Sequence, residues 1–103
     1  MAGEENRGTE LIRAAEHGDL ADVRQRLADG VDPNARGPIG GWTALMRAAT
    51  GDVVAALLAA GANITQTDDL GLDAMAHALE SANGDVARAL QQAGADVDWR
   101  NRY

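Results

Sequence analysis

Two nearby stretches decide the fold: Gly41–Ala49, with the sequence GWTALMRAA, and Leu57–Ile64, with the sequence LLAAGANI. In the first stretch, Thr43 can accept a hydrogen bond from a free N–H of a first helical turn, and the apolar residues after it form one buried face. In the second stretch, Gly61 can take the left-handed conformation that ends a helix without steric cost. Together they predict a short first helix, a turn, and a second helix that stops at a glycine.

The same unit occurs three times, so the chain contains an internal repeat. The repeats span about 7–40, 41–70 and 71–103, in a single domain of residues 7–103 that follows a flexible N-terminus at 1–6. With few aromatic residues, the core is expected to consist of aliphatic side chains between closely packed helices. The expected caps of the first helices are Thr9, Thr43 and Asp73, those of the second helices are Asp19, Asp52 and Asp85, and the glycine stops are Gly30, Gly61 and Gly94.

The middle repeat is shorter than its neighbours. The spacing from Leu45 to Met75 is only 30 residues, against 34 from Leu11 to Leu45, and the loss falls just after Ala49. Since three residues are close to one helical turn, the shorter hairpin can keep its apolar face toward the core. The second helix of this repeat, residues 53–60, has no polar residue, which predicts that neighbours cover it on both sides.

These repeats resemble the ankyrin repeat, whose first helix reads T-P-L-H-x-A-A and whose second helix ends L-L-x-x-G-A-D-V-N. The resemblance covers nearly the whole chain. It implies an all-α solenoid of three helix–turn–helix repeats, joined by β-hairpin-type finger loops near 31–42 and 62–72. In place of the family's histidine the chain has Ile12, Met46 and Ala76, so the imidazole hydrogen bonds that tie adjacent fingers are expected to be absent.

Composition and charge exclude several classes of function. The 103-residue chain has 16 acidic and 9 basic residues, a formal net charge of −7, so nucleic acids and anionic membranes are poor partners. Without cysteine it has no disulfide, thiolate nucleophile or thiolate-held metal. All 9 basic residues are arginine, which is typical of a GC-rich, bacterial gene. There is no apolar run of membrane-spanning length and no signal-like N-terminal segment, so we expect a cytoplasmic protein.

Catalytic chemistry has little support in the sequence. His17 and His77 stand without an obvious partner. An enzyme that pairs His77 with Glu80, three residues later on the same helical face, is an alternative, but this spacing is too common to indicate acid–base chemistry. The chain has one cluster of acids, Asp68, Asp69 and Asp73. Since the cluster lacks the pattern of a calcium loop, we expect it to solvate a finger and cap a helix. We therefore expect no enzyme, no cofactor and no metal site.

Two groups of side chains are candidates for partner contact. By the resemblance, finger loops and the concave surface of the first helices bind partners. The finger candidates are Trp42, Ile39, Leu70 and Leu72, and the concave candidates are Glu16, His17, Thr50, Glu80 and Ser81. Trp42 leads because tryptophan is a frequent interface anchor, although the alternative is a local cluster in which it stacks on the neighbouring finger. The tail at 99–103 could cap the last repeat or engage a partner.

The resemblance thus implies a non-catalytic protein–protein interaction module, with another protein as its partner. The alternative is a self-associating, homo-oligomeric structural or regulatory protein, in which apolar fingers or an end face pair two copies.

Overall fold

The computed structural model describes residues 4–94, and this part of the chain is helical, with no β-strand. The expected all-α class is therefore confirmed. The helices are α1 (Glu4–Glu16), α2 (Leu20–Ala28), α3 (Ala44–Arg47), α4 (Gly51–Ala59), α5 (Ala74–Glu80) and α6 (Gly84–Gln92).

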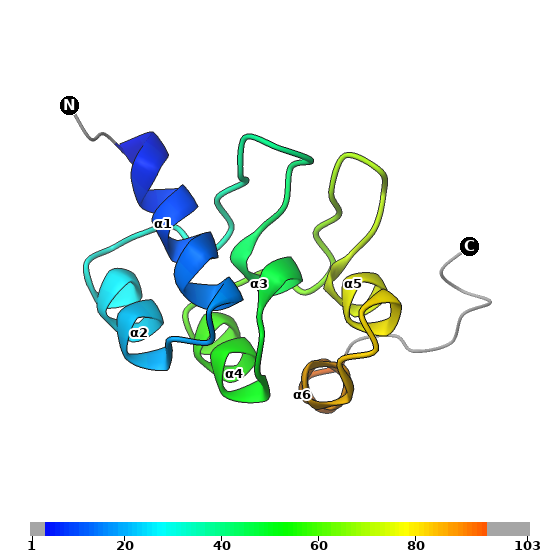
Figure 1. Ribbon diagram of the computed structural model, residues 1–103. Coiled ribbons are helices and arrows are strands. Elements are labelled where there is room, and N and C mark those ends of the chain that lie inside the picture. The colour runs from blue at the N-terminus through cyan, green and yellow to red at the C-terminus, as the bar shows by residue number, and fades with distance from the viewer. Residues whose placement is uncertain (1–3, 95–103) are drawn as a thin grey trace.

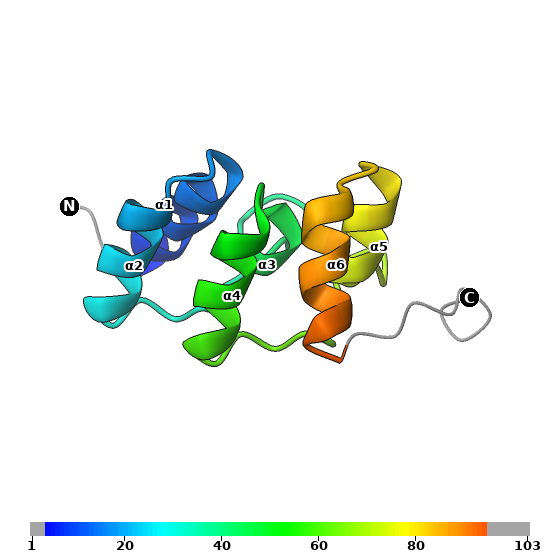
Figure 2. The ribbon, with the colours of Figure 1, turned by 90° about the horizontal axis from the view of Figure 1, so that it is seen from below.

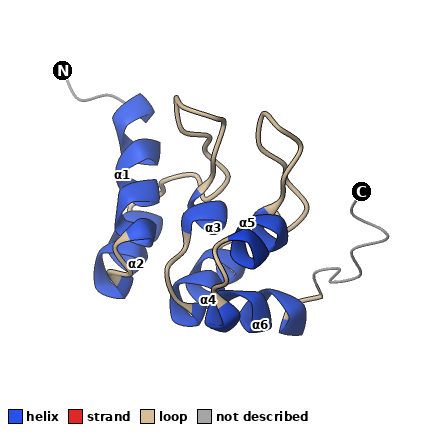
Figure 3. Cartoon of the chain, turned by 45° about the vertical axis from the view of Figure 1, so that its right-hand side comes forward, coloured by secondary structure: helices blue, strands red, loops and turns tan. Residues whose placement is uncertain are grey.

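The helices form two layers of a three-repeat stack (Figures 1 and 2). The first layer contains α1, α3 and α5, in which α3 packs between the other two, and the second layer contains α2, α4 and α6. Loops join each second helix to the next first helix and project from the stack (Figure 3). We call residues 31–42 the first finger and residues 62–72 the second finger. The arrangement is the repeated helix pair that the sequence predicts.

Local capping explains where α3 and α5 begin. The Thr43 side chain accepts a hydrogen bond from the N–H of Met46, and the Asp73 side chain accepts one from the N–H of Ala76. Each bond satisfies one of the backbone N–H groups that a first helical turn leaves free. Both expected caps are confirmed.

The third expected cap of a first helix, Thr9, is wrong. It lies inside α1, which begins at Glu4, so the helix already includes residues 4–6. The reason is the glycine before Thr9. Gly8 is buried, and a Cβ there would lie 2.7 Å from the Cβ of Ala35 in the first finger. The absence of a side chain lets this extra helical turn pack directly on the finger.

The caps of the second helices are only partly as expected. Asp19 caps α2, but α4 is capped by Thr50 and α6 by Asn83. The glycine after each of these caps is taken into the helix, so the expected caps Asp52 and Asp85 fall in the first turn.

The turn before α6 in the third repeat is bonded to the turn before α4 in the second repeat. Asp85 Oδ2 accepts the N–H of Gly51 at 2.6 Å, and Asn83 Nδ2 donates to the carbonyl oxygen of Ala49 at 3.0 Å. The residues that open α6 therefore also satisfy backbone groups at the start of α4.

The glycine stops are confirmed at all three positions. Gly30, Gly61 and Gly94 have φ values of 90°, 100° and 100°, the left-handed region in which a Cβ would be strained. The short middle repeat is also confirmed. Its first helix, α3, has 4 residues against 7 in α5, while α4 keeps 9 residues as α2 and α6 do.

The core lies between the two layers. Val53, Val54 and Leu57 of α4 are fully buried, as expected for a helix with a neighbour on each side. Its outward residues, Ala55 and Ala59, are exposed. Neighbouring helices therefore cover the sides of α4 but not its outer face.

Candidate functional site

Each finger is a hairpin-type loop closed by one backbone hydrogen bond. The N–H of Gly37 donates to the carbonyl of Trp42 at 2.7 Å, and the N–H of Asp68 donates to the carbonyl of Leu72 at 2.9 Å. Such a bond holds the two arms of a loop together without a full ladder of strand pairing. The fingers are therefore fixed projections of the stack.

Two apolar side chains at the finger tips are open to solvent. Ile39 is 73% exposed and Leu70 is 84% exposed. The tips are joined through the main chain, since the N–H of Asp69 donates to the carbonyl of Gly40 at 3.0 Å. The structure therefore brings two of the predicted contact residues to one place, whereas Leu72, nearer the base of its finger, is half-buried.

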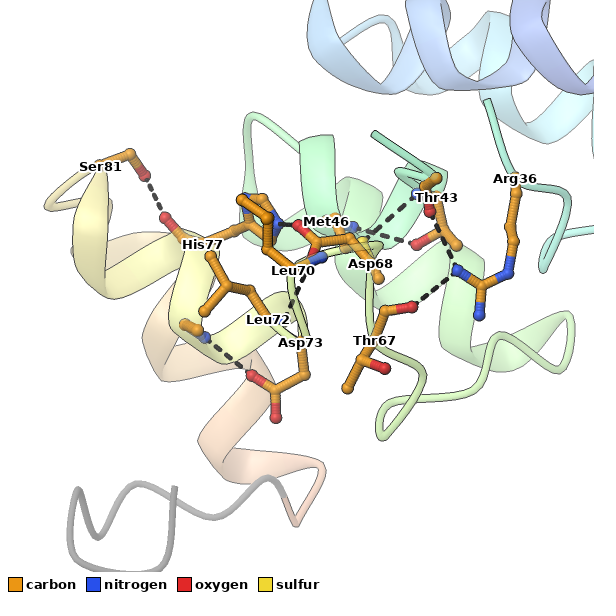
Figure 4. A network of polar contacts seen from close by, with 12 residues as sticks. Arg36, Thr43, Met46, Thr67, Asp68, Leu70, Leu72, Asp73, His77 and Ser81 are labelled. Atoms are coloured by element: carbon orange, nitrogen blue, oxygen red, sulfur yellow. Dashed lines mark hydrogen bonds and ion pairs between the residues drawn. The ribbon is translucent and has the colours of Figure 1, made fainter. Parts of the chain in front are cut away.

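A buried carboxylate organises the second finger (Figure 4). The Asp68 side chain is 1% exposed and accepts hydrogen bonds from the N–H groups of Leu70 and Leu72, each at 2.9 Å. Its other oxygen, Oδ2, lies 2.8 Å from Nε2 of His77 on α5. The expectation that Asp68 is a solvated finger residue is wrong, and so is the expectation that His77 stands alone. The carboxylate is occupied by donors from its own loop and from the next helix.

The same contacts set the charge state of Asp68. Burial on its own raises the pKa of Asp68, but hydrogen bonds from the N–H groups of Leu72 and Leu70 and from the His77 ring outweigh it and lower this pKa below its usual value. Asp68 is therefore ionised at neutral pH and acts as an anionic anchor of the finger.

One sequence signal for this anchor exists. An aspartate that opens a tight loop commonly accepts the N–H two residues later, as Asp68 does with Leu70. The partnership with His77 has no comparable local signal, because the two residues meet only when the finger folds back over α5.

Trp42 lies at the base of the first finger, where other side chains cover part of its ring. The indole is half-buried and packs against the core. The guanidinium carbon of Arg47 lies 4.7 Å from its ring centroid, and the His77 ring meets it edge-on at 6.3 Å. Trp42 therefore belongs to a local cluster that includes Arg47 of α3 and His77 of α5. Anchoring of a partner by Trp42 stays a prediction.

An open groove of about 430 Å³ runs along the ends of the first helices. The C-terminal residues of α1, α3 and α5 all border it. The polar and charged residues that line it are Glu16, Arg47, His77, Glu80, Ser81 and Asn83. Three of the predicted concave residues, Glu16, Glu80 and Ser81, are therefore brought together.

Two other predicted concave residues do not line the groove. His17 is exposed in the turn after α1. Thr50 is the cap of α4, and its Oγ1 accepts the N–H of Val53 at 3.2 Å.

The groove holds one internal ion pair and one free acid. Arg47 Nε lies 3.0 Å from Glu16 Oε1, whereas Glu80 is exposed and forms no ion pair with any residue from 4 to 94. The Ser81 hydroxyl donates to the backbone carbonyl of His77 and does not contact its ring (Figure 4). The acid that pairs with His77 is thus Asp68 and not Glu80 as the enzyme alternative supposed.

Neither a metal centre nor a membrane helix occurs in the described part of the chain. Across residues 4–94, no three potential ligands among histidine, cysteine, aspartate and glutamate are grouped as a metal ion would require. Over the same residues no helix combines the length and the apolar character needed to span a membrane. The tail at 99–103 lies outside the described residues.

Comparison with known proteins agrees with the repeat architecture. A family model described as ankyrin repeats (3 copies) matches residues 11–101. The chain is also 42% identical, over 67 residues, to the mitochondrial disaggregase of Homo sapiens. The match covers 62% of this chain but only 9% of that protein, so it concerns a small part of the relative.

Proposed function

This chain belongs to the ankyrin-repeat family, and we propose on that basis that it is a non-catalytic module that binds another protein through its fingers and groove. Ankyrin repeats generally mediate protein–protein interaction. The residues of this binding surface, which we call the finger–groove face, are Ile39, Asp69 and Leu70 at the tips and Glu16, Arg47 and Glu80 in the groove.

One observation carries the proposal: the exposure of Ile39 and Leu70 on two fingers bonded to each other. Neither side chain contributes to the core, so folding gives no reason for an apolar residue at either position. Burial of such side chains against a partner would stabilise a complex by roughly 25 cal/mol per Å² of apolar area removed from water. Two neighbouring anchors on a rigid support suit an interface.

The contact between Asp68 of the second finger and His77 of α5 supports a non-catalytic role. Nε2 of His77 is bonded to Oδ2 of Asp68, whose Oδ1 accepts two backbone N–H groups, and the Ser81 hydroxyl donates to a backbone carbonyl. Each group thus has a structural partner. Catalysis by the His77 ring would also require a nucleophile within hydrogen-bond reach of it, whereas the Ser81 hydroxyl donates to the backbone carbonyl of His77.

The test is selection of binders from a displayed library with the whole chain as bait, followed by calorimetry with variants. The double variant Ile39→Ser/Leu70→Ser removes both anchors. The matched control is Leu79→Ser, because Leu79 is 52% exposed but lies on α5, away from the finger tips. We expect the double variant to bind selected partners at least tenfold more weakly, about 1.4 kcal/mol or more, and the control to bind within twofold of wild type.

Binders that lose no affinity to the double variant would contradict the proposal. The unfolding midpoints of both variants are measured alongside, so that a loss of binding is not confused with a loss of fold.

A further inference from the structure

The cations near the finger–groove face are already used inside the chain. Arg47 is paired with Glu16 at 3.0 Å and lies over Trp42. In the first finger, Arg36 Nη1 donates to two backbone carbonyls, those of Thr67 at 2.7 Å and Gly41 at 3.2 Å. Each guanidinium therefore already has acceptors within the chain, Arg47 through Nε and Arg36 through Nη1.

Two acids of the same face remain unpaired. Asp69 is exposed beside Leu70 at the finger tips, and Glu80 is exposed at the groove. Neither side chain forms a salt bridge within residues 4–94. The groove is further bordered by helix C-terminal ends, which carry partial negative charge and favour a cation.

The two parts of the face are connected by a very short element. The first finger enters α3 at its N-terminus, and the last two residues of this helix, Met46 and Arg47, line the groove. A helix of four residues is only about 6 Å long, so the short α3 of the middle repeat reduces the distance between the base of the first finger and the groove. One extended segment can therefore lie along both.

Resting on the proposed function, we propose that this face binds a segment of another protein that combines apolar side chains with lysine or arginine. The apolar side chains cover Ile39 and Leu70, and the cations approach Asp69 and Glu80. The formal net charge of −7 attracts such a segment at long range. It also repels a second copy of this chain, which is why another protein is the occupant.

The test uses three synthetic peptides of about 12 residues, which span ~40 Å when extended. One alternates leucine and arginine, one leucine and glutamate, and one serine and arginine. Fluorescence anisotropy with the whole chain measures their binding. We expect the leucine–arginine peptide to bind at least tenfold more tightly than either of the others, and less tightly as salt rises.

Charge-neutralising variants locate the contact. Glu80→Gln and Asp69→Asn are each expected to weaken the leucine–arginine peptide about threefold, as loss of an exposed ion pair does. The matched control is Asp52→Asn, which removes the same charge from an exposed residue of α4 in the other layer and should change affinity by less than 1.5-fold. All three positions are exposed, and unchanged unfolding midpoints establish that the variants are folded.

Three results would overturn the inference. The first is equal or tighter binding of the leucine–glutamate peptide. The second is an equal effect of Asp52→Asn and Glu80→Gln, since net charge alone would then explain the binding. The third is a dimer in sedimentation that Ile39→Ser/Leu70→Ser abolishes, which would show that a second copy of this chain binds the finger–groove face.

Failure of the inference remains distinguishable from failure of the proposed function. Neutral or acidic library binders that nevertheless require Ile39 and Leu70 would refute the basic segment and leave a protein-binding face. Binders of any charge whose affinity does not depend on Ile39 or Leu70 would refute the proposal that the finger–groove face binds proteins.

Discussion

Asp68 and His77 meet at 2.8 Å between Oδ2 and Nε2, and this contact ties the second finger to α5. The carboxylate also accepts the N–H groups of Leu70 and Leu72, so one buried side chain holds both the shape of the finger and its position on the stack.

Removal of this carboxylate should be costly. Asp68→Ala leaves two backbone N–H groups of the finger without their acceptor, and we expect a loss of about 1–3 kcal/mol in the free energy of unfolding. Urea denaturation measures the change. The control is Asp69→Ala, which is exposed and should stay within about 0.5 kcal/mol of wild type. Equal effects of the two substitutions would show that Asp68 is not an anchor.

The anchor also predicts a pH dependence. Because the pKa of Asp68 is lower in the folded state than its usual value near 4, the carboxylate contributes stability above that value. This contribution is lost as the pH falls below about 4 through the folded-state pKa. Denaturation at pH 6 and at about pH 3 should show a larger loss of stability for wild type than for Asp68→Asn, whose side chain does not titrate. Parallel losses in the two proteins would contradict the prediction.

Gly8 offers a test in which two effects oppose each other. Alanine is favoured over glycine inside a helix by about 1 kcal/mol, but a Cβ at position 8 would lie 2.7 Å from the Cβ of Ala35. Because this distance is far below a normal contact, α1 or the first finger must shift, at a typical cost of ~1–3 kcal/mol. We expect Gly8→Ala to be destabilising on balance in thermal unfolding. The control, Gly84→Ala in the first turn of α6, has no atom within 4 Å of the new Cβ and should be neutral or stabilising.

Substitution of Trp42 tests whether this side chain is a packing residue or a partner contact. Since its ring is half-buried under Arg47 and beside His77, Trp42→Ala should destabilise the fold by about 2–4 kcal/mol. Ile39→Ala, at a residue 73% exposed, should stay within about 0.5 kcal/mol. Chemical denaturation compares the two. If Trp42→Ala keeps the midpoint of wild type but loses affinity for a selected binder, then Trp42 is an anchor and not a packing residue.

The features that the sequence predicted correctly are local. A cap such as Thr43 needs only the backbone three residues ahead, and a stop such as Gly61 needs only its own φ, so both follow from residue type and spacing. The start of α1 was predicted wrongly because it depends on Gly8 packing against Ala35 in a finger 27 positions later.

The candidate site was predicted in its members but not in its contacts. The sequence predicts Ile39 and Leu70 as contact residues of the finger loops, and both side chains are exposed. The sequence could not show that Asp68 turns inward to His77, because the approach of finger and helix depends on the path of the loop. Because Ala76 replaces the family's histidine, the sequence predicts no imidazole bond to a finger, yet the next residue, His77, supplies one.

The bonds between the second and third repeats have a consequence for cooperativity. Asp85 satisfies the first N–H of α4, and Asn83 satisfies the carbonyl of Ala49, so detachment of the last helix pair would expose backbone groups of the pair before it. Fraying from this end therefore carries a penalty in the middle of the stack, which favours joint unfolding of the last two repeats.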